Sequence, residues 1–157
     1  TRTDEAASTP RTTPTPPSST DTPATNAANA PEADRQALNT ALASWVAASN
    51  ARDLDRHMTF YMPRLDTYYL SNGVAAAAVR RDKAAVITQA RSVRIDTDPP
   101  AITFARDGRT AVMEFRKQYA IDGGSINSTG EVVQELIWRK TDDGWRIISE
   151  RDKRVIR

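Results

Sequence analysis

The sequence predicts an α+β domain in which three helices pack on one face of a curved, mostly antiparallel sheet. Two observations support this fold class. Apolar residues recur at helical spacing through most of residues 31–93, whereas residues 95–155 alternate with the period of two that is typical of strands. Helices that come first and are followed by a run of strands are expected to gather on one side of the sheet.

Residues 1–31 differ in composition from the remainder of the chain. They are rich in Thr, Pro, Ala and Ser and contain no aromatic residue. Such a segment buries too little apolar surface to offset the entropy of ordering it. We therefore expect a disordered Thr/Pro-rich linker at 1–31 and one folded domain at 32–157. A linker of this kind often separates a membrane anchor, a signal peptide or another domain from an extracytoplasmic module, in the periplasm or at the cell surface.

Three helices are predicted. The first spans residues 31–51, because Leu38, Leu42 and Trp45 recur on one face. A short second helix runs from 53 to 61 and is ended by Pro63. The third covers the Ala-rich run at 74–93, with residue 81 as an alternative start.

The strands follow from alternation and from turn residues. A short strand at 64–70 precedes a turn at residues 71–73, and its regular alternation would place Tyr68 and Tyr69 on opposite faces. Asp-Gly and Gly-Gly pairs mark the turns of the later sheet. Its strands are expected at residues 95–97, 101–105, 110–120, 128–140 and 145–155.

Charge and composition exclude several functions. The net charge of +2 gives no dense basic stripe, so nucleic acid is not an expected partner. The absence of Cys excludes disulfides and thiol catalysis. His57 is the only histidine, too few for a zinc site, and we expect neither a metal nor a cofactor. No apolar run is long enough for a transmembrane segment.

The order of these elements, together with the Trp45 helix, the strand around Phe115 and the closing Trp145-Arg146-Ile147…Glu150, resembles the nuclear transport factor 2-like superfamily, also called SnoaL-like. It looks most like the small accessory domains of exported bacterial proteins such as L,D-transpeptidase-type cell-wall proteins. In those domains the central strand carries Gln where this chain has Lys117. The resemblance implies a cystatin-like cone whose mouth is a ligand-binding pocket, without implying any one reaction.

Aromatic residues are the candidate ligand-binding residues. Such side chains form the walls of many small-molecule pockets, and they fill hydrophobic cores equally well. The candidates are Trp45, Tyr61, Tyr69, Phe115, Tyr119 and Trp138.

His57 is the candidate for acid/base chemistry, with Asp53 one helical turn before it. The surrounding residues are mostly charged, which instead indicates a solvent-facing helix, so we assign no catalytic residue. A second polar group comprises Glu114, Arg116 and Gln118 on one strand and Gln134 and Glu135 on the next. It is either a pocket floor or a solvated sheet face with cross-strand ion pairs, or half of a homodimer interface.

The resulting expectation is a non-catalytic accessory domain that binds a small ligand, a cell-wall fragment or a protein partner. The alternative is a small SnoaL-like enzyme that performs isomerase, dehydratase or hydrolase chemistry in the cone pocket. The sequence alone does not decide whether the chain is an enzyme, and the missing acid/base set favours the first expectation.

Overall fold

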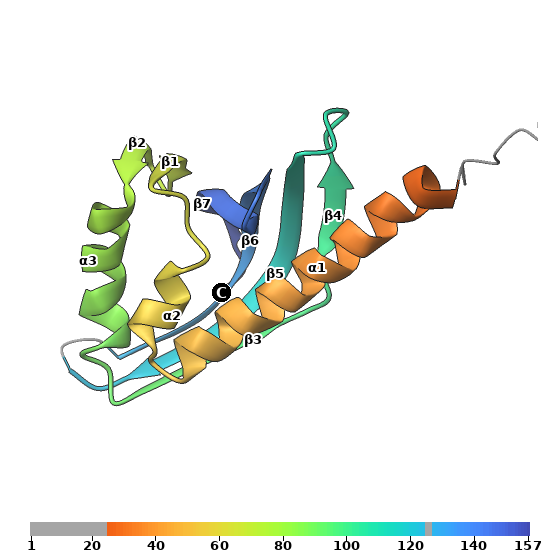
Figure 1. Cartoon of the computed structure of the whole chain (residues 1–157). Coiled ribbons are helices and arrows are strands. Elements are labelled where there is room, and N and C mark those ends of the chain that lie inside the picture. The colour runs from red at the N-terminus through yellow and green to blue at the C-terminus, as the bar shows by residue number, and fades with distance from the viewer. Residues whose placement is uncertain (1–24, 125–126) are drawn as a thin grey trace, which may run out of the picture.

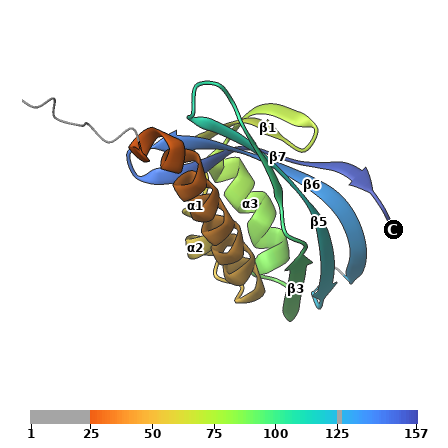
Figure 2. The same ribbon diagram turned by 90° about the vertical axis from the view of Figure 1, so that its right-hand side faces the viewer.

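The structure is a computed structural model that describes residues 25–124 and 127–157. Three helices cover the concave face of a curved sheet (Figures 1 and 2), which confirms the predicted α+β class. Most of the predicted linker, residues 1–24, lies outside the described part of the chain. No helix within the described part is long and apolar enough to cross a membrane.

Helix α1 spans Thr25–Asn50 and contains Pro31, so it starts earlier than the sequence predicted. The Ala residues at 27, 28 and 30 have high helix propensity and extend the helix to the N-terminal side of Pro31. At the other end, Asp53 N donates to Ala48 O and Arg52 N donates to Ser49 O. Arg52 adopts a φ of 56°. This is a Schellman motif, which ends the helix and turns the chain towards α2.

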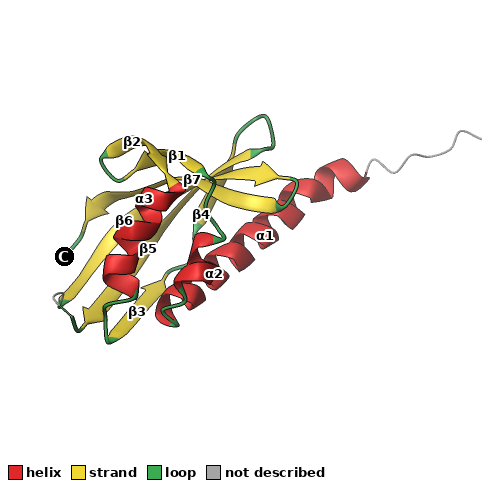
Figure 3. Ribbon diagram, turned by 60° about the vertical axis from the view of Figure 1, so that its left-hand side comes forward, coloured by secondary structure: helices red, strands yellow, loops and turns green. Residues whose placement is uncertain are grey.

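Helices α2 (Leu54–Met58) and α3 (Ala76–Ile87) complete the helical layer, which lies on one side of the sheet (Figure 3). The prediction that the third helix continues to residue 93 was wrong, as was its alternative start at residue 81. Residues from Ser92 instead alternate as strand β3, because Val93 and Ile95 pair with β5. Pairing with a long neighbouring strand outweighs the helix propensity of this short stretch.

Strands β1 (Arg64–Tyr68) and β2 (Ser71–Ala75) form a hairpin that the sequence did not predict. Leu65 pairs with Val74 and Tyr68 with Ser71, so the turn falls at Tyr69-Leu70 rather than at residues 71–73. Tyr69 takes a φ of 52°, in the left-handed region that tight turns require. Its side chain therefore leaves the regular strand alternation.

Five further strands build the main sheet: β3 (Ser92–Thr97), β4 (Ala101–Phe104), β5 (Thr110–Asp122), β6 (Ser128–Thr141) and β7 (Gly144–Val155). The order is β2-β1-β7-β6-β5-β3, and β4 also pairs with β5. Only β1 and β7 pair in parallel among the strands described. Two register irregularities between β6 and β7 bend the sheet, as β-bulges do.

The two faces of the sheet have different compositions. The inner face of β5 carries Ala111, Met113, Phe115 and Lys117, all buried. Apolar side chains of this face pack with Leu38, Leu42 and Trp45 of α1 in the hydrophobic core. The outer face carries cross-strand ion pairs, among them Lys153–Glu114 and Arg151–Glu135. The expected cross-strand ion pairs at Glu114 and Glu135 thus match the structure, but Glu135 is buried rather than solvated, and Gln134 lies on the inner face, where it donates to Glu150. A homodimer through the outer face stays a prediction.

Candidate ligand-binding site

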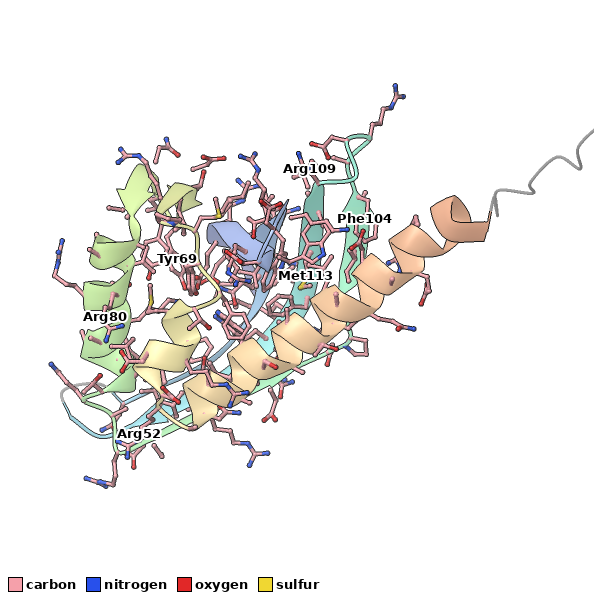
Figure 4. The ribbon with its side chains drawn as sticks, viewed as in Figure 1. Arg52, Tyr69, Arg80, Phe104, Arg109 and Met113 are labelled. Atoms are coloured by element: carbon pink, nitrogen blue, oxygen red, sulfur yellow. The ribbon has the colours of Figure 1, made fainter. Side chains whose placement is uncertain are left out.

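A cavity of about 220 Å³ lies between the helices and the inner face of the sheet. Much of its wall is apolar, and Figure 4 shows Tyr69 directed into the interior. The polar part of the wall comes from all three helices, from the β1–β2 turn and from β5 and β7. The apolar wall residues are Trp45, Val86, Ile87, Val93, Ile95 and Ile121; the polar ones are Ser49, His57, Tyr68, Tyr69, Asp82, Lys83, Lys117, Tyr119 and Asp152.

Glu150 of β7 is the centre of the polar group beside this cavity. Its carboxylate is fully buried. Oε1 accepts hydrogen bonds from Lys83 Nζ at 2.5 Å, Tyr69 OH at 3.1 Å and Gln134 Nε2 at 3.1 Å. Oε2 accepts one from Tyr61 OH at 2.6 Å. Together these donors hold the pKa of Glu150 down at about 2 although burial opposes ionisation.

A hydrogen-bonded chain continues from Tyr61 to α1. Trp45 Nε1 donates to Tyr61 OH at 3.0 Å, and the same hydroxyl lies 3.2 Å from His57 Nε2. The other ring nitrogen, Nδ1, lies 3.0 Å from Ser49 Oγ. Both ring nitrogens of His57 are therefore engaged within the protein, which leaves neither free to take a proton from a ligand.

Burial sets the charge state of His57. Desolvation, with the nearby Lys83 ammonium as a second cause, lowers the pKa of this imidazole to about 4. The ring is therefore neutral at pH 7. Asp53 does not pair with it: its side chain caps α2 by accepting a hydrogen bond from Arg56 N at 3.0 Å. The sequence-based pairing of Asp53 with His57 was wrong because the Asp side chain satisfies the helix end instead.

Tyr68 and Tyr69 both face the cavity, contrary to the expectation that one must point outward. Their rings meet edge to face with centroids 4.8 Å apart. Tyr68 OH donates to Asp82 Oδ2 at 2.5 Å, whereas Tyr69 OH donates to Glu150. The left-handed backbone at Tyr69 accounts for the difference, since regular alternation ends at Tyr68.

Lys117 is a lysine of the cavity wall that lies on the sheet itself. It lies on the inner face of β5, its side of the strand is apolar, and only 8% of it is exposed. No acceptor within hydrogen-bond distance and no carboxylate within 4.0 Å faces its ammonium among the described residues; the ring of Tyr119 lies 5.8 Å away. Desolvation, followed by repulsion from Lys83, lowers the pKa of Lys117.

The remaining lysines provide a direct contrast. The sequence contains four lysines, and all of them lie in the described part of the chain. Lys83 pairs with Glu150, Lys140 with Asp34 at 2.8 Å, and Lys153 with Glu114. Buried charges are normally paired, so Lys117, without a partner of its own among the described residues, is the exception.

The six aromatic candidates separate into three groups. Trp45, Tyr69 and Tyr119 line the cavity. Tyr61 is buried behind it and connects His57 to Glu150. Phe115 and Trp138 lie in the hydrophobic core and are not part of the cavity wall, because their positions on β5 and β6 face α1 and the other core side chains.

Sequence reasoning missed the charged centre of the site. Lys83 and Glu150 are 67 residues apart, and no local pattern brings them together. A signal for Lys117 was present: it is the charged residue in an otherwise apolar alternation from Ala111 to Tyr119. Ser49 offered no signal, since Ser is common near helix ends.

A second depression, of about 520 Å³, lies on the outer face of the sheet around Arg94, Asp96 and Glu131. Its charges are already paired, for example Arg94 with Asp96 and Arg157 with Glu131. It therefore offers less to a ligand than the inner cavity. The described residues hold no cluster of three or more metal-ligating side chains.

The sequence matches no model of a known protein family and no curated protein. Solved structures do match. A protein of the NTF2-like family from Streptomyces avermitilis, named for a proposed dehydratase activity, superposes with a TM-score of 0.67 at 16% identity, over 81% of this chain and 99% of that one. An NTF2-like protein with a cystatin-like fold from Novosphingobium aromaticivorans gives 0.62 at 14% identity, over 85% and 90%.

The chain has the NTF2-like fold. A third match, Bd1075 from Bdellovibrio bacteriovorus, has a TM-score of 0.63 at 17% identity and covers 76% of this chain but 41% of the other. At these identities the likeness concerns the cystatin-like architecture alone. What the NTF2-like cone holds in this chain has to be argued from its own side chains.

Proposed function

We propose that this chain is a small-molecule-binding domain whose cavity takes a compact, largely apolar compound that carries an anionic oxygen group. The observation that carries the proposal is Lys117, a buried cation without a partner among the described residues. A carboxylate placed against its ammonium would supply the missing charge-assisted hydrogen bond. The apolar wall would cover the body of the ligand.

Neighbouring charges support an anion at Lys117 in particular. Glu150 is already saturated by four donors and is unsuited to bind a cation. Asp82 is occupied by Tyr68 OH. Lys83 adds positive charge close to Lys117, because repulsion from it contributes to the lowered pKa of Lys117. Two of the three carboxylates near Lys117 are therefore already occupied, and the third, Asp152, lies more than 4.0 Å from its ammonium.

The test compares benzoate with benzamide, which has a similar shape and no charge. Isothermal titration of the full chain is expected to show benzoate binding at least about tenfold more tightly, since one charge-assisted contact is worth about 1.5–3 kcal/mol. Lys117→Met should remove this preference, whereas Lys140→Met, which alters a lysine paired with Asp34 far from the cavity wall, should retain it. Equal binding of the two compounds, or unchanged preference in Lys117→Met, would refute the proposal.

We further propose that the domain is non-catalytic and accessory to a larger, extracytoplasmic protein. The support is the Thr/Pro-rich composition of residues 1–31 and the match to only 41% of the Bdellovibrio chain, where the same fold accompanies additional sequence. Deletion of residues 32–157 from the parent protein should then impair its function, while His57→Gln should not. Normal function after the deletion would contradict the accessory role.

The alternative, an acid/base enzyme, has one specific observation in its favour. His57, Tyr61 and Glu150 form a buried hydrogen-bonded chain next to the cavity, and the Streptomyces neighbour is named for a proposed dehydratase activity. Turnover of a hydroxylated substrate that is lost in Tyr61→Phe, with ligand binding retained, would establish this role. Its chief difficulty is that both nitrogens of His57 are occupied.

A further inference from the structure

We propose that Lys117 is a carbonyl-reactive amine, which forms an imine with an aldehyde or ketone held in the cavity. This inference rests on the proposed function in one respect: the carbonyl compound enters the same cavity. It adds a covalent reaction that anion binding alone does not require.

The placement of Lys117 leaves its nitrogen available for attack. The residue pairs across the sheet with Val132 of β6 and with Thr97 of β3, and within the described residues its ammonium has no hydrogen bond to either side chain. Its side chain lines the cavity, and neither a hydrogen bond nor an ion pair within the described residues occupies its nitrogen. An amine must present a free lone pair to a carbonyl carbon, and this arrangement permits it.

The surroundings make the unprotonated amine of Lys117 more accessible than that of a solvent-exposed lysine. A lysine becomes nucleophilic when it is desolvated in an apolar pocket or lies near another cation, and Lys117 has both features. Burial and the Lys83 charge lower its pKa. The carboxylates of Glu150 and Asp152 attract the ammonium and raise its pKa, but their influence is smaller than that of burial and Lys83. His57, neutral at pH 7, and the ring of Tyr119 complete the surroundings.

The reaction balances without a further reactant. The Lys117 Nζ lone pair attacks the carbonyl carbon, and the π electrons of the C=O bond move to oxygen. Proton transfer from nitrogen to oxygen gives a carbinolamine. The C–O bond then breaks as the nitrogen forms a double bond to carbon and loses its remaining proton, so one water leaves. Reduction of the imine by added cyanoborohydride fixes it as a stable secondary amine.

The experiment uses benzaldehyde with cyanoborohydride on the full chain at pH 7, followed by peptide mass mapping. Each of the four lysines gives an internal comparison. Lys117 is expected to acquire the benzyl group about tenfold faster than Lys140 and Lys153, because a lowered pKa leaves more of the amine unprotonated. Preferential labelling of the exposed lysines, or equal labelling of all, would overturn the proposal.

Separate readouts of benzoate binding and of labelling, both on the unmodified chain, distinguish this inference from the proposed function. Lys117→Arg cannot form an imine and should lose the adduct. Lys140→Met should retain both the adduct and benzoate binding. Benzoate binding without labelling of Lys117 would leave the proposed function standing and end the inference. Labelling of Lys117 without benzoate binding would contradict the proposed function and leave the inference standing. If the unmodified chain shows neither benzoate binding nor labelling, both proposals are wrong.

Discussion

The inner and outer faces of the sheet carry the same kinds of charged residues in opposite settings. On the inner face, the side chains of Lys83 and Glu150 are 14% and 0% exposed. On the outer face, those of Lys153 and Glu114 are 38% and 40% exposed. Glu150 is held by three further donors, whereas Glu114 has Lys153 alone as its partner among the described residues. The Lys83–Glu150 pair thus belongs to a packed network, whereas the Lys153–Glu114 pair is solvated.

This difference indicates where charge contributes to the fold and where it contributes to solubility. Solvent screens an exposed pair, so its net contribution is small. A buried pair is also of small net benefit as a whole, yet removal of one member leaves the other charged and desolvated. Single substitutions should therefore have large effects on the inner face and small effects on the outer one.

The largest effect is expected from Glu150→Gln. This change keeps the side-chain volume but leaves Lys83 buried without a counter-charge, at a cost of about 3–5 kcal/mol in the free energy of unfolding. Glu114→Gln is the matched control and should cost at most about 1 kcal/mol. Urea unfolding monitored by tryptophan fluorescence measures both, and similar losses for the two variants would invalidate the comparison.

Acid should destabilise the protein in two steps that both arise from the inner face. The pKa of His57 is lowered from 6.5 to about 4, so below pH 6.5 the unfolded state binds the proton more tightly. The contribution of His57 to the free energy of unfolding is therefore fully present above pH 6.5. It falls by about 3 kcal/mol as the pH drops to 4. The pKa of Glu150, lowered from 4.5 to about 2, adds a second loss between these values.

The variant His57→Gln removes the first step and leaves the second. Its free energy of unfolding should be nearly constant between pH 6.5 and 5, while that of the unmodified protein declines. Urea midpoints at half-unit pH intervals distinguish the two profiles. Parallel profiles would mean that another group is responsible for the acid sensitivity.

Lys117→Met should behave in the opposite way to other inner-face substitutions. It replaces a buried ammonium that has no partner among the described residues with an apolar side chain of similar length. We expect the free energy of unfolding to rise by about 1–2 kcal/mol, because a residue kept for function is often not the most stable choice. Lys83→Met should be destabilising instead, because Glu150 loses its counter-charge. Thermal unfolding of both variants tests the contrast, and a loss of stability in Lys117→Met would show that this lysine has a structural role.

The smallest effect is expected for Lys153→Met on the outer face. Its pair with Glu114 is exposed, so the free energy of unfolding should change by less than about 1 kcal/mol. What effect there is should shrink between low salt and 1 M salt, since ions screen surface charges. Thermal unfolding at the two salt concentrations measures this effect. A loss of stability that does not depend on salt would indicate that the aliphatic part of the lysine side chain packs against the sheet.

The sequence predicted the fold class and most strands because alternation and turn residues are local signals. The long strands around Phe115 and Trp145 follow from period-two patterns that no competing propensity disturbs. The β1–β2 turn was predicted at the wrong place because the residues of Ser71-Asn72-Gly73 favour turns more strongly than those of Tyr69-Leu70. There the pairing of Leu65 with Val74 decided the register, which is a contact that no local rule contains.

The site was less predictable because its chemistry depends on distant pairing. Trp45, Tyr69 and Tyr119 were identified by residue type alone, and they do line the cavity. Lys83 and Glu150 meet only after α3 has packed against the sheet and β7 has entered its place. The availability of Lys117 could not be inferred, since it depends on which carboxylates the neighbouring lysine already occupies.

The position of β7 has a consequence for the order of folding. This strand is the last in the chain, yet it lies between β1 and β6, and Thr67 pairs with Ser149. Contacts that span so much of the sequence close late, because a large loop must first be formed. Glu150 lies on that strand, so a growing chain has no counter-charge for Lys83 until β7 has been made. The cavity is then among the last features of this domain to form.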